Sequence, residues 1–204
     1  PGARVGYFSE FFADGESLLR SVELEAPWIK REVIMNGKPY MQPRWICYMA
    51  EKPSLTYTYF KTTNHPVPFT PTVLEIKSQL EAFLNSKFNC VLMNLYKDGK
   101  DFMEWHPDDE PLFGRDPTIV SVSFGQRRAF DFRKNANPKI RFRSALSTKF
   151  VTFLCFRYML GGGDVLVMEG GALQNHWQHA VLIGNHNDKG RINMTFRTIT
   201  DPEI

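Results

Sequence analysis

The sequence predicts a mostly β fold with flanking helices, of the α+β class, in which two sheets pack as a jelly roll. From residue 90 onward the chain consists of short strand-like stretches separated by Gly, Pro, Asn and Asp turns. Residues 191–197 alternate polar and apolar side chains with the period of two that a strand requires. With 204 residues, 43% of them hydrophobic, and no break in composition, we expect one domain over residues 1–204.

Two helices are expected before residue 90. Residues 14–25 have Leu18, Leu19 and Val22 at helical spacing, with Asp14 as the cap and Pro27 closing the segment. A second helix begins at Thr72, where Thr72 and Glu75 are spaced as a capping box ahead of an apolar stripe. Between the two helices, residues 40–60 are typical of extended hairpins rich in aromatic residues.

The strands follow in order after the second helix. We expect them at 90–96, 118–124, 129–132, 139–143, 164–168, 179–183 and 191–199. Residues 144–160 stand out, because their apolar spacing suits either a buried strand or a short helix. If this segment disrupts the sheet, the strand that carries His179 could be displaced.

Residues 191–197 place Arg191, Asn193, Thr195 and Arg197 on one face of a strand. Two guanidiniums on a face that looks buried are costly unless an anion lies between them. Because the planar guanidinium binds carboxylate with two parallel hydrogen bonds, a small dicarboxylate is the expected ligand. The alternative is an amphipathic edge strand with its charges in water.

Two imidazoles and one carboxylate supply a possible metal centre. His106 and Asp108 are two residues apart and point the same way in extended backbone, and His179 precedes the arginine strand by about a dozen residues. Such a set is the facial triad of non-haem Fe(II) oxygenases. The three remaining histidines, His65, His176 and His186, are predicted not to be ligands.

Taken together, these strings resemble the AlkB family of Fe(II)- and 2-oxoglutarate-dependent dioxygenases, and most closely its eukaryotic members that repair alkylated DNA and RNA. The resemblance runs from about residue 27 to residue 197, and compared with the family pattern residues 144–160 would be an insertion or an artefact of the gene model. It is carried by residues 42–44 (QPR), 55–59 (LTYTY), 94–98 (NLYKD), 106–110 (HPDDE), 121–125 (SVSFG), 177–179 (WQH) and 191–197 (RINMTFR).

The resemblance implies a double-stranded β-helix (the jelly roll) over residues 90–200, preceded over residues 1–89 by helices and a nucleotide-recognition lid. It implies Fe(II) as cofactor, 2-oxoglutarate as cosubstrate and molecular oxygen. His106, Asp108 and His179 would hold the metal. The cosubstrate would contact Arg191 and Tyr96 at its distal carboxylate and Arg197 near its metal-proximal end, and the remaining residues of the family pattern are Asn94, Asn193 and Thr195.

The implied reaction is oxidative demethylation of bases such as 1-methyladenine and 3-methylcytosine, with release of formaldehyde. A methyl group on a Watson-Crick edge requires a flipped or single-stranded base, so the expected partner is single-stranded or locally opened DNA, or RNA. Tyr57 and Tyr59 match the base-contacting aromatic pair, whose alternative role is core packing. Asp109 matches a base-contacting acid, and Gln42 and Arg44 lie in the expected lid.

Positive charge is concentrated between residues 127 and 149, where eight Lys and Arg residues face one Asp. Such a stripe can neutralise phosphates, and Arg128 and Arg133 are the predicted phosphate contacts; the alternative is a solvated hairpin. Three cysteines without metal spacing indicate an intracellular protein, in the nucleus or the cytoplasm. We expect a monomer without a membrane partner, since no run of 18 apolar residues occurs.

Alternative functions remain open at this point. The chain could be a nucleic-acid reader of this family with lost or weak turnover, or an enzyme that removes RNA modifications. It could also be a related dioxygenase acting on proteins or small molecules, although that function would leave the Tyr57/Tyr59 pair and the basic stripe unused.

Overall fold

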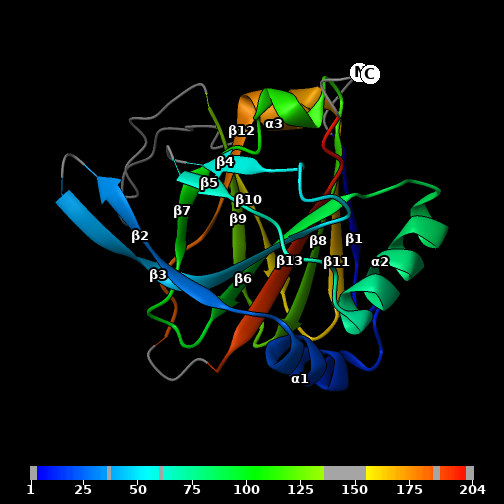
Figure 1. Ribbon diagram of the computed structural model, residues 1–204, viewed down its shortest axis with the longest axis horizontal. Coiled ribbons are helices and arrows are strands. Elements are labelled where there is room, and N and C mark those ends of the chain that lie inside the picture. The colour runs from blue at the N-terminus through cyan, green and yellow to red at the C-terminus, as the bar shows by residue number, and fades with distance from the viewer. Residues whose placement is uncertain (1–3, 36–37, 60–61, 136–154, 186–188, 201–204) are drawn as a thin grey trace, which may run out of the picture.

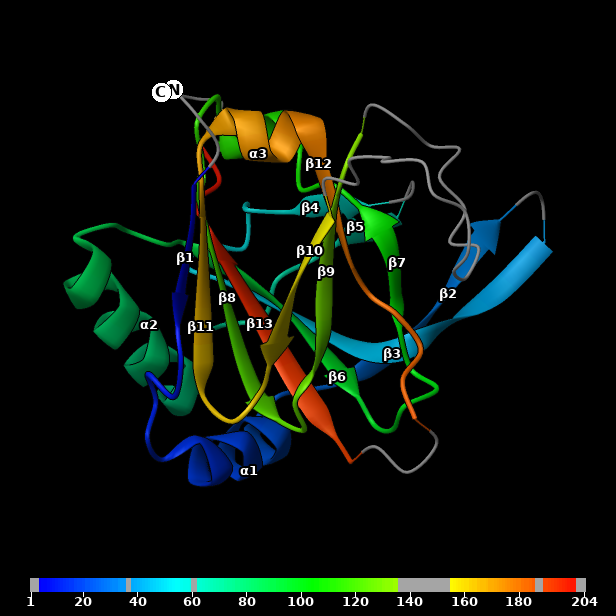
Figure 2. The same cartoon turned by 180° about the vertical axis from the view of Figure 1, so that it is seen from behind.

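The computed structural model describes residues 4–35, 38–59, 62–135, 155–185 and 189–200, which form two facing sheets (Figures 1 and 2). The large sheet has seven strands in the order β1 (Arg4–Phe8), β11 (Asp164–Glu169), β8 (Thr118–Gly125), β13 (Arg191–Arg197), β6 (Cys90–Tyr96), β3 (Lys38–Ala50) and β2 (Ile29–Met35). The small sheet has the order β10 (Cys155–Leu160), β9 (Arg128–Lys134), β12 (Trp177–Val181) and β7 (Met103–His106). The predicted double-sheet jelly roll is confirmed.

Shorter elements complete the described chain. Strands β4 (Tyr57–Tyr59) and β5 (Thr62–Asn64) form a separate hairpin. The helices are α1 (Gly15–Glu25), α2 (Pro71–Leu84) and α3 (Gly171–His176), with a 3-10 turn, η1, at Pro111–Phe113. Within the described residues, no helix combines the length and the apolar character needed to span a membrane.

Two apolar layers hold these elements together. In the first, Val22 of α1 and Ile76 and Leu80 of α2 pack with Met194 and Phe196 of β13 on one face of the large sheet. The second layer lies between the two sheets and contains side chains from both, among them Phe130, Phe132, Leu166 and Tyr96. Because β13 is central in the large sheet, its two faces look into these two different layers.

The capping box predicted at Thr72 and Glu75 is wrong. The helix begins at Pro71, so Thr72 lies in its first turn and not at the cap. The Glu25 carboxylate at the end of α1 accepts hydrogen bonds from the Thr72 N–H at 3.1 Å and from the Thr72 hydroxyl at 2.5 Å. A side chain distant in sequence therefore satisfies a donor that local capping would have served. Asp14 does occupy the N-cap position of α1, but without a side-chain hydrogen bond.

The strand predictions are confirmed at 90–96, 118–124, 129–132 and 164–168, with small extensions. The strand predicted at 179–183 begins two residues earlier, and that predicted at 191–199 ends at Arg197. Residues 139–143 and 144–154 lie outside the described residues, whereas residues 155–160 form β10 and pair with β9. Strand β12 pairs with both β9 and β7, so the strand that carries His179 keeps its place in the sheet.

Candidate functional site

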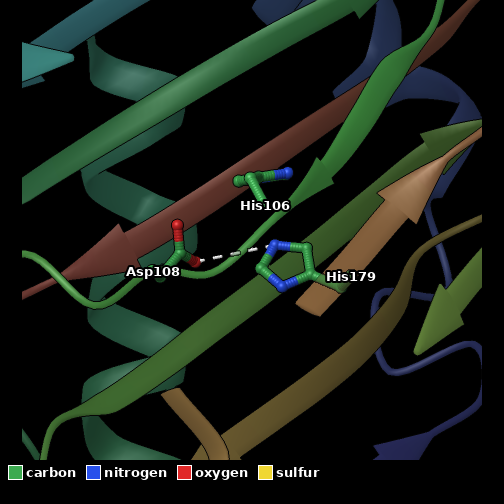
Figure 3. A group of neighbouring side chains, drawn as sticks. All are labelled: His106, Asp108 and His179. Carbon is green, nitrogen blue, oxygen red and sulfur yellow. Dashed lines mark ion pairs between the residues drawn. The ribbon is translucent and has the colours of Figure 1, made fainter. Parts of the chain in front are cut away.

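The pairing of β7 with β12 brings the two predicted imidazole ligands together. His106 lies opposite His179 in the register, and their ring centroids are 4.3 Å apart. Asp108 follows the end of β7, and one ligand atom from each of these three residues lies within 4.8 Å of the others. Figure 3 shows the three side chains beside one another, with the ion pair between Asp108 and His179 dashed. We call this set the metal-ligand cluster.

Hydrogen bonding prepares the cluster for a cation. The Nδ1 atom of His106 lies 2.8 Å from the Glu104 carbonyl, so Nδ1 carries the proton and Nε2 has the lone pair for a metal. One oxygen of Asp108, Oδ1, accepts a 2.7 Å hydrogen bond from Arg197. The other oxygen, Oδ2, is buried without a hydrogen-bond partner among the described residues and lies 3.8 Å from Nε2 of His179.

The charge states of the cluster suit a divalent metal. Burial lowers the pKa of His106 to about 3, with a further contribution from His179. Burial also lowers the pKa of His179, so both imidazoles are neutral near pH 7. Burial alone would raise the pKa of Asp108, but the Arg197 charge and the imidazoles lower it to about 2. Two neutral imidazoles and one carboxylate match the ligand set of a facial triad.

The polar face of β13 lies between the two sheets, as the alternation predicts. Arg191 is fully buried; its Nη2 donates to Ser123 Oγ at 2.8 Å and its Nε to the Leu160 carbonyl at 3.3 Å. The third nitrogen, Nη1, has no hydrogen-bond partner among the described residues. Burial lowers the pKa of Arg191 to about 10, so the guanidinium stays charged near pH 7. The alternative of an edge strand in water is therefore wrong.

The other predicted cosubstrate residues line one cavity with the metal-ligand cluster. We call it the metal-side cavity. It is lined by Asn94, Tyr96, Asn193, Thr195 and Arg197 as well as by the three residues of the metal-ligand cluster. Arg191 lies behind it, with its guanidinium carbon 5.4 Å from the centre of the Tyr96 ring. Asn193 donates to Ser121 Oγ at 2.7 Å, and Thr195 donates to Asn193 Oδ1 at 3.2 Å.

The buried atoms without partners test whether the site fits a metal and an anion. Asp108 Oδ2 is an acceptor that a cation would satisfy, whereas Arg191 Nη1 and Arg197 Nε are donors that a carboxylate would satisfy. Buried groups of this kind are costly in a protein unless a ligand completes them. The residues present therefore fit a metal with an adjacent dicarboxylate.

Of the three residues predicted to contact the base, the structure puts Tyr57 at the cavity and Asp109 beside the cluster, and it does not describe the Tyr59 side chain. Tyr57 lines the metal-side cavity, but it is 3% exposed and its hydroxyl donates to Glu110 at 2.7 Å. Its ring also packs near Tyr48 and Phe113, so packing accounts for much of its position. Tyr59 belongs to β4, but its side chain is outside the described set. Asp109 is exposed beside the cluster, and its contact with a base stays a prediction.

Gln42 and Arg44 both lie on β3, beside the site. Arg44 is buried, donates from Nε to Asn94 Oδ1 at 2.7 Å and lines the cavity that contains the metal-ligand cluster. Gln42 is 8% exposed, and its Oε1 has no hydrogen-bond partner among the described residues. Both residues therefore stay candidates for substrate contact.

Arg128 is a correction to the predicted phosphate contacts. It is 3% exposed, and its guanidinium donates to three backbone carbonyls, those of Asp98, Asp101 and Leu182. A guanidinium held inside the protein in this way cannot reach a phosphate. Arg127 is also engaged, in an ion pair with buried Asp164 at 2.6 Å.

Arg133 remains compatible with a phosphate contact. Its guanidinium donates twice to Gln178 Oε1, at 2.8 and 2.6 Å, and lies 4.4 Å from the centre of the Trp105 ring. It is partly exposed, and its neighbour Lys134 is exposed at the end of β9. The basic residues between 136 and 154 are outside the described part of the chain.

Three residues that contact the site were missed. Ser121 and Ser123 on β8 accept from Asn193 and Arg191, and the polar alternation of residues 121–123 was the signal that could have identified them. Glu110, which accepts from Tyr57, was part of the quoted string but had no assigned role. His65 and His176 are exposed and lie outside the metal-ligand cluster, as predicted, whereas His186 is not described.

Comparison with known proteins agrees with this site. The family described as the 2OG-Fe(II) oxygenase superfamily matches residues 5–197. The bovine "Alpha-ketoglutarate-dependent dioxygenase alkB homolog 3" is 37% identical over 187 residues, which are 91% of this chain and 62% of that protein. The mouse "DNA oxidative demethylase ALKBH2" is 30% identical over 190 residues, which are 92% of this chain and 76% of that protein.

Solved structures show the same fold at low sequence identity. The structure of OsALKBH1 aligns with a TM-score of 0.58 at 13% identity, covering 95% of this chain and 96% of that one. A 2OG-Fe(II) oxygenase family oxidoreductase from Burkholderia pseudomallei aligns with a TM-score of 0.52 at 12% identity, covering 95% and 84%. The chain spans about three fifths of the length of the AlkB homolog 3 relatives that it matches.

Proposed function

The chain belongs to the 2OG-Fe(II) oxygenase superfamily, and on that premise we propose that it is an oxidative demethylase of alkylated nucleobases. One observation carries the proposal. Half-buried His106 and buried Asp108 and His179 face the same cavity as the polar side of β13, where Nη1 of Arg191 has no hydrogen-bond partner among the described residues. A metal ion would bind the three ligands of the cluster, and a dicarboxylate would accept a hydrogen bond from Arg191.

The roles of the residues follow from their contacts. His106, His179 and Asp108 Oδ2 would hold Fe(II), and Arg197 keeps Asp108 ionised and oriented. Arg191, supported by Ser123 and the Tyr96 ring, would bind the distal carboxylate of 2-oxoglutarate. Fe(II), 2-oxoglutarate and oxygen would supply the oxidising equivalents: 2-oxoglutarate would lose CO2 and take one oxygen atom to become succinate, the other oxygen atom would hydroxylate the methyl group, and the hydroxymethyl adduct would lose formaldehyde.

The protein's own contribution is to position the methyl group and to exclude water. Phe130, Met168 and Val181 line the apolar side of the metal-side cavity and restrict solvent there. The hydroxyl of Tyr57 is held by Glu110, so its ring is fixed at the wall of the same cavity. A fixed wall keeps the reacting groups in one geometry.

The proposed substrate is DNA that is single-stranded or locally opened, with RNA as a second substrate. The substrate is motivated by the relatives' printed names, one of which is a DNA oxidative demethylase. The base must leave a duplex to reach a buried metal. Asp109 next to the cluster would favour cationic bases such as 1-methyladenine and 3-methylcytosine, because a carboxylate attracts positive charge.

Formaldehyde release from a panel of methylated DNA and RNA oligonucleotides, with Fe(II) and 2-oxoglutarate supplied, tests the proposal. We expect formaldehyde from oligonucleotides that contain 1-methyladenine or 3-methylcytosine and none when 2-oxoglutarate is omitted. The matched control is His179→Ala, compared with His176→Ala. Decarboxylation of 2-oxoglutarate with no formaldehyde from any oligonucleotide would show that the substrate is of another class. Oligonucleotide binding without decarboxylation would indicate a reader without turnover.

A further inference from the structure

Arg128, at the start of β9, is a buried cation to which the proposed function gives no role. Its Nη1 donates to the carbonyls of Asp98 and Asp101 at 3.2 and 2.9 Å, and its Nη2 donates to the Leu182 carbonyl at 2.7 Å. All three acceptors are neutral backbone groups, so they do not balance the charge of the guanidinium. Burying a charge among neutral acceptors costs folding free energy, which is a reason to look for a function of this cation in the site.

The carbonyls that Arg128 binds belong to segments that adjoin both strands with imidazole ligands. The loop at residues 98–101 leads from β6 into β7, and β7 ends at His106. Leu182 directly follows β12, which carries His179. Strands β7 and β12 are neighbours in the small sheet (Figure 2). Arg128 therefore fastens the loop before one ligand strand to the end of the other.

Arg128 also contacts Tyr96, which lines the metal-side cavity and is 1% exposed. The guanidinium carbons of Arg128 and Arg191 each lie 5.4 Å from the centre of the Tyr96 ring. A backbone connection runs in parallel with this ring contact. Leu160 pairs with Arg128 in the register of β10 and β9, and the Leu160 carbonyl accepts from Nε of Arg191 at 3.3 Å. Arg128 is thus linked to Arg191 by two separate routes.

The charge of Arg128 acts on Arg191 as well. Burial is the main cause that lowers the pKa of Arg191 to about 10; Tyr96 opposes this shift, and repulsion from Arg128 adds to it. Two like charges beside one buried ring destabilise each other, and a bound anion relieves that repulsion. A ligand with two carboxylates is the kind of anion that such a pair of cations favours.

We propose that Arg128 is a positioning residue for the cosubstrate, which holds the Tyr96 ring against Arg191 both directly and by fastening the loop that follows Tyr96 to the end of β12. Arg128 is not among the residues that line the metal-side cavity, so it acts through Tyr96 and not by touching the ligand. The inference rests on the proposed function only in taking 2-oxoglutarate as the ligand of Arg191. It requires no particular methylated substrate.

The first test is a calorimetric titration of 2-oxoglutarate into folded protein, at Mn(II) concentrations that saturate each variant. Arg128→Met, which removes the charge and all three donated hydrogen bonds, should weaken 2-oxoglutarate binding by about 10- to 100-fold, the range for residues that orient the groups of a metal site. Arg128→Lys keeps a charge beside the ring but loses the planar fork, so its loss should be smaller.

Leu80→Ala is the control for a general loss of stability. Leu80 is 0% exposed and packs in the apolar layer on the other face of the large sheet. This variant should unfold more easily than the wild-type protein and keep the wild-type affinity for 2-oxoglutarate. Thermal unfolding of each variant, measured without metal, shows whether the Arg128 and Leu80 variants are comparably destabilised.

A double-mutant cycle with Tyr96→Leu separates positioning from a purely structural role. If Arg128 acts through the Tyr96 ring, adding Arg128→Met or Arg128→Lys to Tyr96→Leu should weaken 2-oxoglutarate binding little beyond Tyr96→Leu alone. A structural brace would add its full loss to that of Tyr96→Leu. In the formaldehyde assay, the KM for 2-oxoglutarate should rise in both Arg128 variants, while the KM for the methylated oligonucleotide stays near the wild-type value.

Wild-type affinity for 2-oxoglutarate in the Arg128 variants overturns the inference, as does a fully additive loss in the double variants. If Arg128→Met does not fold, Arg128→Lys decides the question by the same two criteria. The proposed function fails separately. If no oligonucleotide releases formaldehyde but calorimetry gives the expected losses, Arg128 positions the cosubstrate of an enzyme that acts on another class of substrate.

Discussion

The two faces of β13 are equally buried, but one carries apolar side chains and the other carries polar and charged ones. Ile192, Met194 and Phe196 are 0% exposed and pack among apolar side chains on the side of α1 and α2. On the other face Arg191 and Arg197 are 0% and 4% exposed, yet each has one donor nitrogen that no described residue accepts a hydrogen bond from. The apolar face is packed by the protein alone, whereas we propose that a ligand completes the polar face. Burial alone does not separate the two faces, whereas the buried polar atoms without partners on β13 lie only on its polar face.

The largest expected effect is the loss of Fe(II) binding when a residue of the metal-ligand cluster is removed. His106→Ala and His179→Ala should each weaken Fe(II) binding by more than about 100-fold and abolish turnover, because each removes one of three ligands. The measurement is an anaerobic Fe(II) titration followed by the formaldehyde assay. His65→Ala and His176→Ala are the controls. Loss of iron in the His176 variant with retention in the His179 variant would reverse the ligand assignment.

A substitution on the apolar face of β13 should lower the free energy of unfolding. Phe196→Ala removes a fully buried ring that packs near Phe88, so the free energy of unfolding should fall by about 3–5 kcal/mol. Urea denaturation measures this change. Leu24→Ala on α1 is the control, because Leu24 is 86% exposed. A loss below about 1 kcal/mol for Phe196→Ala would mean that this layer is not tightly packed.

The helices that cover the apolar face are joined by a polar contact with a smaller effect. Glu25→Ala removes the acceptor for the Thr72 N–H and hydroxyl at the start of α2, and should cost about 0.5–2 kcal/mol of unfolding free energy. Glu23→Ala, an exposed acid on the same helix, is the control. Equal stability of the two variants would show that the Glu25 to Thr72 contact contributes nothing.

The smallest expected effect concerns basic residues on β9. Arg133→Gln and Lys134→Gln should each flatten the plot of log affinity against log salt for single-stranded DNA by about 0.7. Arg20→Gln on α1 is the exposed control. Arg128→Gln should lower stability and leave the salt slope unchanged, since Arg128 serves backbone carbonyls. If the salt slope changed only in the Arg128 variant, Arg128 and not Arg133 or Lys134 would be the phosphate contact.

Much of the site could be predicted because it follows a local pattern. The period of two in residues 191–197 determines which side chains share a face, and the large sheet preserves that pattern in its register with β6. The His106 and Asp108 spacing likewise survives in the structure. Strands β1, β2 and β7 were missed because they are edge strands or adjoin turns, where periodicity is weak.

The errors arose where distant parts of the chain meet. Arg128 looked like part of a basic surface stripe, but carbonyls from two separate loops hold it inside the protein. The capping partner of Thr72 is 47 residues away, at Glu25. Contacts of this kind depend on the tertiary fold and leave no periodic signal in the sequence.

The most direct test of the difference between the two faces is a calorimetric titration of 2-oxoglutarate into protein loaded with Mn(II), which takes the same types of ligand. Wild-type protein should bind 2-oxoglutarate, and Arg191→Met should bind it about 10- to 150-fold more weakly, the loss expected for a hydrogen bond to a charged group. The unfolding midpoint of the metal-free variant is measured as well to show that it is folded, because Met also removes the donors to Ser123 Oγ and to the Leu160 carbonyl. Equal 2-oxoglutarate affinity in the two folded proteins would contradict the claim that the polar face of β13 is built for this ligand.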